Sequence, residues 1–211
     1  HGNEPSHHMA YLYNYVGQPW KTQSRVKQIL NEFYKPEPDG LIGNEDCGQM
    51  SAWYVLSAVG FYPVTPGSTV YAIGSPLFPE VRFNLENGKS FVIRAPGVSD
   101  RNVYIQSATL NGKRYDKSFL LHEDLMRGGE LVFQMGAQPN FKWGTGRGNE
   151  PVSRIDGPEI VPVPVIKAAG QTFRGRLEVK LIGLDDTSIH YTLDGSEPDS
   201  NSAKFTKPIV I

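Results

Sequence analysis

The chain has 211 residues, of which 39% are hydrophobic and 20% charged, and its 21 basic and 22 acidic residues leave a formal net charge of −1. This balance gives no electrostatic reason to expect nucleic acid or an anionic membrane as a partner, and the sequence holds no apolar run long enough to span a bilayer. Its single cysteine, Cys47, cannot form an intrachain disulfide, so it indicates no redox compartment.

Residues 1–66 are predicted to be helical. After the polar stretch "GNEPSHH", apolar and aromatic residues recur at helical spacing up to Gly17, with one face formed by His8, Tyr11, Leu12, Tyr15 and Val16. A second helix, capped by Thr22, has an apolar stripe formed by Val26, Ile29, Leu30 and Phe33. The opposite face of this helix is polar, so we expect that face at the surface.

A third helix is predicted over "MSAWYVLSAVG", where Asp46 and Gln49 read as a capping box before it and Gly60 ends it. Because this helix is apolar on nearly all sides, we expect it to be buried. Two other helices cannot cover it on every side, which predicts further helices upstream of His1 in the parent protein.

Residues 67–146 change to an alternating pattern that predicts a small antiparallel β-sandwich. Two runs of strand-like sequence carry a hairpin signal, Asn87-Gly88 in the first and Asn111-Gly112 in the second. "GELVFQMG" supplies another strand, and the segment between Asp116 and Met126 is expected to hold a helical turn.

Residues 147–163 read as a linker rich in glycine, proline and polar residues. Residues 164–211 then predict a second all-β module, with strands in "LEVKLIG" and "IHYTLDG". About fifty residues are marginal for an independent core, and the module ends inside a strand-like run, so we expect it to be truncated.

A polar cluster stands at the start of the first helix and comprises Asn3, Glu4, Ser6, His7 and His8. With Pro5 at the first helical position, Glu4 falls at the helix N-terminus, where a carboxylate is favoured. Glu4 then suits a metal site or an acceptor for substrate hydroxyls, although a plain helix cap is the commoner role. Zinc is disfavoured, because adjacent histidines on a helix point in different directions.

A second polar cluster, "GNEDCGQ", precedes the third helix and contains Asn44, Glu45 and Asp46. Asp46 could be a simple N-cap, or a carboxylate placed to act as a base on water. Both clusters put carboxylates at the starts of helices, which is expected where helix ends line one pocket.

Other chemistries find no support in the sequence. No glycine-rich loop stands between a strand and a helix, as a nucleotide site requires, and no Ser-His-Asp arrangement is evident. The aromatic residues Trp20 and Trp53 could stack on sugar rings, although most such residues are part of a core.

Long motifs resemble one known family. "HGNEPSHHMAYLYNYVGQPWKTQSRVKQIL", "PDGLIGNEDCGQMSAWYVLSAVGFYPVTPGS" and "YAIGSPLF" are similar, in that order, to the carboxy-terminal part of the glycoside hydrolase family 92 catalytic domain, the calcium-dependent exo-α-mannosidases. The tail "IHYTLDGSEPDSNSAKFTKPIVI" resembles the small β module appended to chitobiase-type and other bacterial glycosidases.

This resemblance implies an α + β multidomain fold: the last helices of an (α/α)6 barrel over residues 1–66, then a small antiparallel β-sandwich and a partial all-β module. The rest of the barrel and an N-terminal β-sandwich would lie upstream in the same parent chain. It also implies hydrolysis with inversion at the anomeric carbon.

The resemblance assigns roles residue by residue. Asp46 would be the general base that activates water, and Asn3 and Glu4 would hold a Ca²⁺ ion in the −1 subsite. Asn44, Glu45 and His7 are assigned to substrate binding. Some family members carry Asp in place of Asn44, and an amide cannot accept a proton alongside the base as a carboxylate could. The general acid would lie in a motif upstream of this chain.

The expected partners are mannose-containing glycans, with α-1,2 linkages the favoured substrate, and the expected location is periplasmic or extracellular. We expect this fragment alone to be inactive, because one half of the acid and base pair is missing. The alternative is a carbohydrate-binding or structural module without catalysis.

Overall fold

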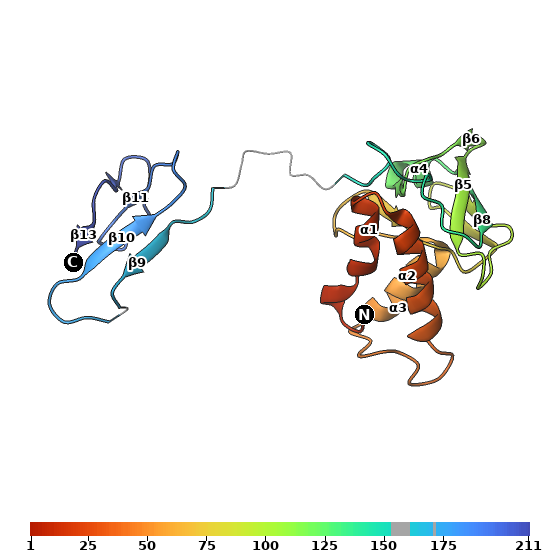
Figure 1. Cartoon of the computed structure of the whole chain (residues 1–211), viewed down its shortest axis with the longest axis horizontal. Coiled ribbons are helices and arrows are strands. Elements are labelled where there is room, and N and C mark those ends of the chain that lie inside the picture. The colour runs from red at the N-terminus through yellow and green to blue at the C-terminus, as the bar shows by residue number, and fades with distance from the viewer. Residues whose placement is uncertain (153–160, 171) are drawn as a thin grey trace. The chain divides into compact units, whose positions relative to one another are not determined.

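The computed structural model describes residues 1–152, 161–170 and 172–211. The chain divides into two compact units, His1–Arg154 and Ile155–Ile211, and Figure 1 labels their helices and strands. The predicted linker over residues 147–163 spans the boundary of the two units, with Asn149 hydrogen-bonded to Ser118 of the first unit, and its residues 153–160 lie outside the described part.

The first unit begins with two short 3₁₀ turns followed by three α-helices. These elements are η1 (Glu4–Ser6), η2 (Met9–Tyr11), α1 (Leu12–Tyr15), α2 (Pro19–Glu32) and α3 (Gln49–Val59). The single helix expected from the opening stretch to Gly17 is therefore wrong. Since these turns do not follow α-helical spacing, the predicted face is only partly right. Tyr11 is buried as expected, but Leu12 and Val16 are 45% and 66% exposed. His7 and Asn14, which lie outside that face, are buried.

Helix α2 has the predicted apolar stripe but an earlier start. Val26, Ile29 and Leu30 are buried. The helix begins at Pro19, where the fixed φ of proline suits the first position. Thr22 is thus a buried residue within the helix rather than its cap.

Helix α3 is buried along only part of its circumference. Met50, Trp53, Ser57 and Ala58 are buried, whereas Val55 is 58% exposed. The expectation of burial on nearly all sides is therefore wrong for this chain. An exposed apolar side chain on an otherwise apolar helix indicates a face that nothing in the described part of the chain covers.

Strands of the first unit form two sheets. The smaller has the order β1-β2-β7, from Phe61–Tyr62, Val70–Ile73 and Phe119–Leu121. The larger has the order β3-β4-β8-β5-β6, from Glu80–Asn84, Ser90–Arg94, Gly129–Gly136, Tyr104–Leu110 and Lys113–Arg114. Since β1 belongs to the predicted helical zone, residues 1–66 and 67–146 share one sheet and one compact unit.

Both predicted hairpins are confirmed. β3 and β4 pair antiparallel across the turn with Gly88 at φ 78°, and β5 and β6 pair across Asn111 and Gly112, both at positive φ. The helical turn expected before Met126 is α4 (His122–Met126). One pairing differs from expectation: β4 and β8 are parallel, so the larger sheet is mixed rather than wholly antiparallel.

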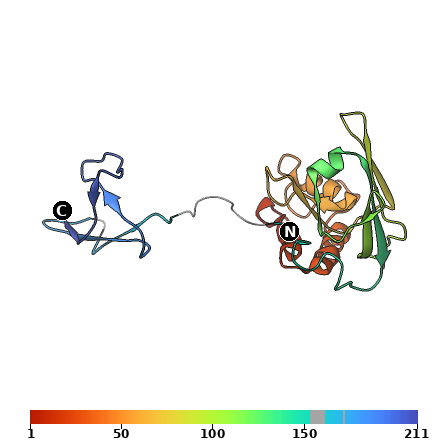
Figure 2. The ribbon, with the colours of Figure 1, turned by 90° about the horizontal axis from the view of Figure 1, so that it is seen from above.

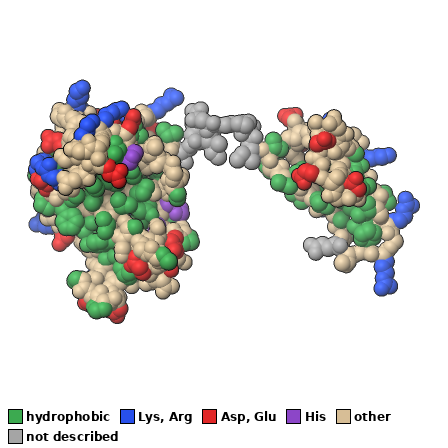
Figure 3. All heavy atoms as spheres, turned by 180° about the vertical axis from the view of Figure 1, so that it is seen from behind, with side chains coloured by type: hydrophobic (Ala, Val, Ile, Leu, Met, Phe, Trp, Pro, Cys, Tyr) green, Lys and Arg blue, Asp and Glu red, His purple; other side chains and the backbone are tan. Residues whose placement is uncertain are grey.

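Two apolar clusters hold the first unit together. One joins both sheets to the end of α3 through residues such as Phe61, Phe91, Leu120 and Phe133. The other joins the helices around Tyr11 and Trp53. Figure 2 shows the helices on one side of the strands in this unit. Apolar side chains also gather on the surface of the unit seen in Figure 3, the pattern of a surface that contacts other protein.

The described residues of the second unit form five short strands. β10 (Glu178–Ile182) pairs antiparallel with β9 (Val165–Ala168) and β13 (Ile209–Val210), and β11 (His190–Tyr191) pairs with β12 (Ala203–Lys204). None of its described residues is buried. A unit with so little buried surface gains little stability from apolar packing.

None of the helices in the described ranges has the length and apolar character needed to cross a membrane.

Candidate active site

The two polar motifs meet because their backbones touch. A Cβ added to Gly43 would lie 2.2 Å from the carbonyl oxygen of Gly2, and one added to Gly2 would lie 3.1 Å from the carbonyl oxygen of Ile42. Gly43 also has φ +95°, a conformation that residues with side chains rarely adopt. The glycines in "HGNEP" and "IGNED" therefore allow the two segments to lie against each other.

The loop that carries Asp46 has an unusual backbone. Asp46, Cys47 and Gly48 have φ values of 51°, 57° and 94°, so three consecutive residues lie in the left-handed region. Aspartate and glycine tolerate this region better than cysteine does. Backbone strain of this kind persists where surrounding structure enforces it, and it is concentrated at functional sites.

Asn3 and Glu4 form a one-turn cap rather than the start of a long helix. The Asn3 Oδ1 atom accepts a hydrogen bond from the backbone N–H of Glu4 at 3.1 Å, and the Ser6 hydroxyl donates to the Asn3 carbonyl at 2.7 Å. η1 has three residues, with Glu4 at its first position and Pro5 at its second. The helix dipole expected to favour the Glu4 carboxylate is therefore absent, because no long helix begins there.

The side chain of Glu4 lies near enough to that of Asp46 to affect its protonation. Desolvation raises the pKa of Asp46 above its ordinary value of 3.8, and the charge of Glu4, the hydrogen bond between the two carboxyl groups and the charge of Glu45 raise it further. Two neighbouring carboxylates disfavour full ionisation of both, so one of them holds a proton more readily.

Substitution of Glu4 by Gln is expected to lower the pKa of Asp46, because it removes the nearest negative charge. The carboxyl carbon of Asp46 can be followed by NMR as a function of pH. Glu37→Gln, which removes an exposed glutamate before the "IGNED" motif, provides the matched control. An unchanged Asp46 pKa in Glu4→Gln would show that the two carboxyl groups do not interact.

His7 lies buried beneath this pair. The Gln49 side-chain amide is 3.2 Å from its Nδ1 atom, and the Met50 sulfur is 3.1 Å from its Nε2 atom. Because the amide N–H can only donate, Nδ1 accepts and Nε2 carries the proton. Desolvation lowers the pKa of His7, although the charges of Glu4 and Asp46 oppose that effect. This placement favours support of the site over direct contact with substrate.

The lowered pKa of His7 predicts pH-dependent stability. Above pH 6.5 the ring is neutral in both folded and unfolded chains, whereas below it the unfolded chain takes up the proton first. The free energy of unfolding of the first unit should therefore fall as the pH decreases from 6.5 toward the folded-state pKa. Urea titrations at several pH values should show this fall in the native chain and in His8→Gln, and a smaller one in His7→Gln. Equal pH dependence in all three would contradict it.

Glu45, not Asp46, caps helix α3. Its two carboxylate oxygens accept hydrogen bonds from the Ser51 N–H at 3.1 Å and the Ser51 hydroxyl at 2.9 Å. The helix itself begins at Gln49 after Gly48, so the expected capping box from Asp46 to Gln49 is wrong. Capping by Glu45 leaves the exposed Asp46 carboxylate available to a ligand, and Asn44 is likewise exposed on the loop.

Aromatic rings pack next to His7, among them Trp53, which is buried in the core rather than exposed for stacking on a sugar. Trp53 is fully buried, its indole N–H donates to the His7 carbonyl at 2.9 Å, and its ring is parallel to that of Tyr34 within 4°. The Tyr34 hydroxyl donates to the Met50 carbonyl at 3.2 Å and lies 3.0 Å from the His1 Nε2 atom. Trp53 lies one turn after Gln49 on α3, a spacing that could have suggested the contact.

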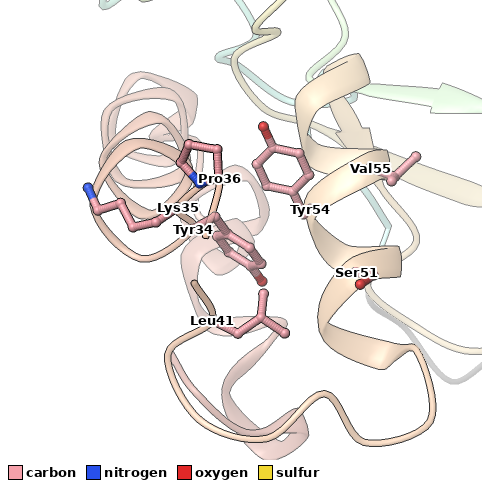
Figure 4. A pocket seen from close by; sticks show the side chains of 7 residues that line it. All are labelled: Tyr34, Lys35, Pro36, Leu41, Ser51, Tyr54 and Val55. Carbon is pink, nitrogen blue, oxygen red and sulfur yellow. The ribbon is translucent and has the colours of Figure 1, made fainter. Parts of the chain in front are cut away.

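A hollow of about 510 Å³ opens beside the site, between the loop after α2 and the outer face of α3. Figure 4 shows its lining residues Tyr34, Lys35, Pro36, Leu41, Ser51, Tyr54 and Val55. No carboxylate lines it, so it is not the place where Asp46 would act. Ser51 connects it to the acidic cluster through its hydrogen bonds to Glu45.

No group of three or more histidine, cysteine, aspartate or glutamate side chains within the described ranges is arranged to hold a metal ion. The site offers two neighbouring carboxylates, Glu4 and Asp46, and the amide oxygen of Asn3. These are hard oxygen donors of the kind that Ca²⁺ prefers, but fewer than the six to eight oxygens that Ca²⁺ commonly takes.

Comparison with known families identifies both units. The profile of the glycosyl hydrolase family 92 catalytic domain matches residues 1–137. A second profile, described as Fn3 associated, matches residues 179–211.

Solved structures agree. A family GH92 α-mannosidase from Bacteroides thetaiotaomicron is 46% identical with a TM-score of 0.69, covering 72% of this chain and 20% of that protein. An inverting family GH92 mannosidase from the same species is 47% identical with a TM-score of 0.69, covering 72% of this chain and 21% of that one. A protein from Arthroderma benhamiae described as an uncharacterized secreted glycosidase is 36% identical over 155 residues, 72% of this chain and 20% of its own length.

The chain thus spans about a fifth of the length of these relatives. Within that fifth the backbone agrees with theirs and the family profile extends over both polar motifs. The chain therefore belongs to glycosyl hydrolase family 92.

Proposed function

We propose that this chain is the carboxy-terminal part of an inverting exo-α-mannosidase that removes terminal α-linked mannose from glycans, with α-1,2 linkages favoured. The observation that carries this proposal is the meeting of Glu4 and Asp46, which brings two separate motifs into one acidic site. Supporting it, one relative is described as an inverting mannosidase, and another was solved in complex with mannoimidazole.

Asp46 is the proposed general base. Asp46 is exposed on its loop and does not cap helix α3. Its raised pKa makes its carboxylate a stronger base than that of an ordinary aspartate. The carboxylate would accept a proton from water as the water oxygen attacks the anomeric carbon. Since only the deprotonated form can act, activity should decline as the pH falls through the pKa of Asp46.

Glu4 is too close to Asp46 to be the acid of an inverting pair. Glu4 lies near enough to Asp46 for its charge and hydrogen bonding to raise the pKa of Asp46, whereas an inverting acid and base lie roughly 6.5–9.5 Å apart to leave room for water. The general acid must therefore be another group, which we place in a part of the enzyme outside this chain. On this basis the 211-residue chain alone should release no mannose.

Asn3 and Glu4 are the proposed residues of this chain that hold Ca²⁺. Their donor atoms are oxygens, and in the described part of the chain neither Glu4 nor Asp46 forms a salt bridge that would neutralise it. A bound Ca²⁺ would orient the vicinal hydroxyls of the sugar. Because these donors are too few to complete its coordination, the remaining oxygens would come from water, substrate or other segments of the enzyme.

Release of mannose from an α-1,2-mannobioside by the complete enzyme, with and without a calcium chelator, tests this function. We expect activity that the chelator abolishes and added Ca²⁺ restores, and a loss of Ca²⁺ affinity in Glu4→Gln measured by calorimetry. Full activity in the chelator would exclude the proposed role of Ca²⁺. Mannose release by the 211-residue chain alone would contradict the placement of the general acid outside this chain.

The natural partners are proposed to be mannose-containing glycans met outside the cytoplasm, in the periplasm or the extracellular medium. The support is the relative described as secreted.

A further inference from the structure

A second hollow in the first unit lies away from the acidic site. It has a volume of about 350 Å³ and is lined by Tyr13, Trp20, Lys21, Ser24, Arg25 and Tyr104. Trp20 and Arg25 lie in the first half of α2, whereas Tyr34 of the acidic site follows the end of that helix. Since the helix has 14 residues, a rise of 1.5 Å per residue separates its two ends by about 20 Å.

Three partly exposed aromatic rings surround this hollow. Tyr13, Trp20 and Tyr104 each keep part of their surface in solvent. Phe141, which is 65% exposed, packs edge-on against Trp20 at a centroid distance of 5.0 Å. Partly exposed aromatic rings at a concave surface provide flat apolar faces on which the C–H face of a sugar ring can stack.

The charged side chains of the hollow are both cationic. Lys21 lies over the Tyr13 ring with its ammonium 5.7 Å from the ring centroid, and the Arg25 guanidinium donates to Gln28 at 2.6 Å. In the described part of the chain neither forms a salt bridge. Both side chains are exposed, and their remaining N–H groups have no acidic partner among the residues that the structure describes.

The lining contains no aspartate, glutamate, asparagine or glutamine. A neutral sugar presents hydroxyl groups that need acceptors as well as donors. Among the side chains that line the hollow, only the hydroxyls of Ser24 and the tyrosines can accept a hydrogen bond. A ligand that brings its own negatively charged oxygens fits the two cations better, because guanidinium and ammonium groups bind phosphate and carboxylate strongly.

We propose that this hollow binds an anionic saccharide, one that bears a phosphate or carboxylate group, at a site separate from the acidic site. The sugar ring would stack on Trp20, and its anionic group would contact Arg25 and Lys21. Such a site would hold a charged glycan chain on the protein without taking part in hydrolysis. It does not depend on the roles proposed for Asp46 and Glu4.

NMR titration of the 211-residue chain with mannose 6-phosphate tests the proposal, with mannose and inorganic phosphate as separate probes. We expect mannose 6-phosphate to shift the indole N–H signal of Trp20 and to bind at least about tenfold more tightly than either separate probe, since it gains both stacking and charge pairing. Glucuronic acid, which carries a carboxylate instead, should shift the same signal.

Variants locate the site. Arg25→Gln and Trp20→Ala should each weaken the binding of mannose 6-phosphate about tenfold, whereas Arg101→Gln, which removes an exposed arginine elsewhere, should leave it unchanged. Circular dichroism checks that each variant is folded. If Trp20→Ala does not fold, Lys21→Gln serves as a second variant that removes a cation. Equal affinity in the native chain, Arg25→Gln and Lys21→Gln would overturn the proposal, as would shifts confined to signals of His7 and Asp46.

Discussion

Substitution of Asp46 by Asn is expected to reduce kcat of the proposed mannosidase, tested as the complete enzyme, by roughly 10²- to 10⁴-fold, the usual contribution of a general base. An amide cannot accept the proton of the attacking water. The loop should be retained, because Asp46 has φ 51° and asparagine tolerates this left-handed conformation well. Steady-state kinetics with an α-mannobioside measure the change.

Asp39→Asn, which alters an exposed aspartate in the loop that leads to Gly43, provides the matched control and should keep native kcat. A loss of binding without a loss of kcat in Asp46→Asn would contradict its role as base. Asp46→Gly extends the test, since glycine suits the same φ and leaves space for a small anion. Azide, which needs no deprotonation, should restore turnover there and give β-mannosyl azide.

Gly43→Ala is expected to destabilise the contact between the two polar motifs. The added Cβ would lie 2.2 Å from the Gly2 carbonyl oxygen, and the φ of +95° is itself strained for alanine. The strained φ alone costs about 1–3 kcal/mol, and relief of the clash requires that the two motifs separate. The free energy of unfolding of the first unit should therefore fall by more than the strained φ accounts for.

Gly48→Ala separates these two causes. Its φ is +94°, and a Cβ added there meets nothing within 4 Å. Urea unfolding followed by tryptophan fluorescence reports on the first unit, which contains Trp20, Trp53 and Trp143. Gly43→Ala should be less stable than Gly48→Ala by at least about 1 kcal/mol, and its Asp46 pKa should move back toward 3.8 as Glu4 moves away. Equal losses of stability would mean that the contact between the motifs is not tight.

The strands of the two hairpins and β8 were well predicted from the sequence, since their signals are local, whereas the three strands of the smaller sheet were not predicted. Alternation and an Asn-Gly turn fix each hairpin within about fifteen residues. The parallel pairing of β4 with β8 was not predictable in this way, because it joins Phe91 to Gly129 across 38 positions. The opening helix was wrong because two 3₁₀ turns interrupt the spacing on which the prediction rested.

The candidate site was predictable in its residue types but not in its geometry. Family motifs singled out Glu4 and Asp46, yet their contact depends on Gly2 and Gly43 meeting across 41 positions of sequence. The positive φ of Cys47 had no sequence signal, since cysteine rarely adopts it. The contacts of Glu45 and His7 within the fold were not predicted either: Glu45 accepts hydrogen bonds from Ser51 of α3, and His7 contacts Gln49.

The configuration of the first mannose released tests most directly whether Asp46 acts as a base on water. Proton NMR can follow the complete enzyme acting on an α-mannoside before the product mutarotates. Attack by water activated at Asp46, on the face opposite the leaving group, predicts that β-mannose appears first. Initial release of α-mannose would show retention, and would make a carboxylate of the enzyme a nucleophile in place of the base proposed for Asp46.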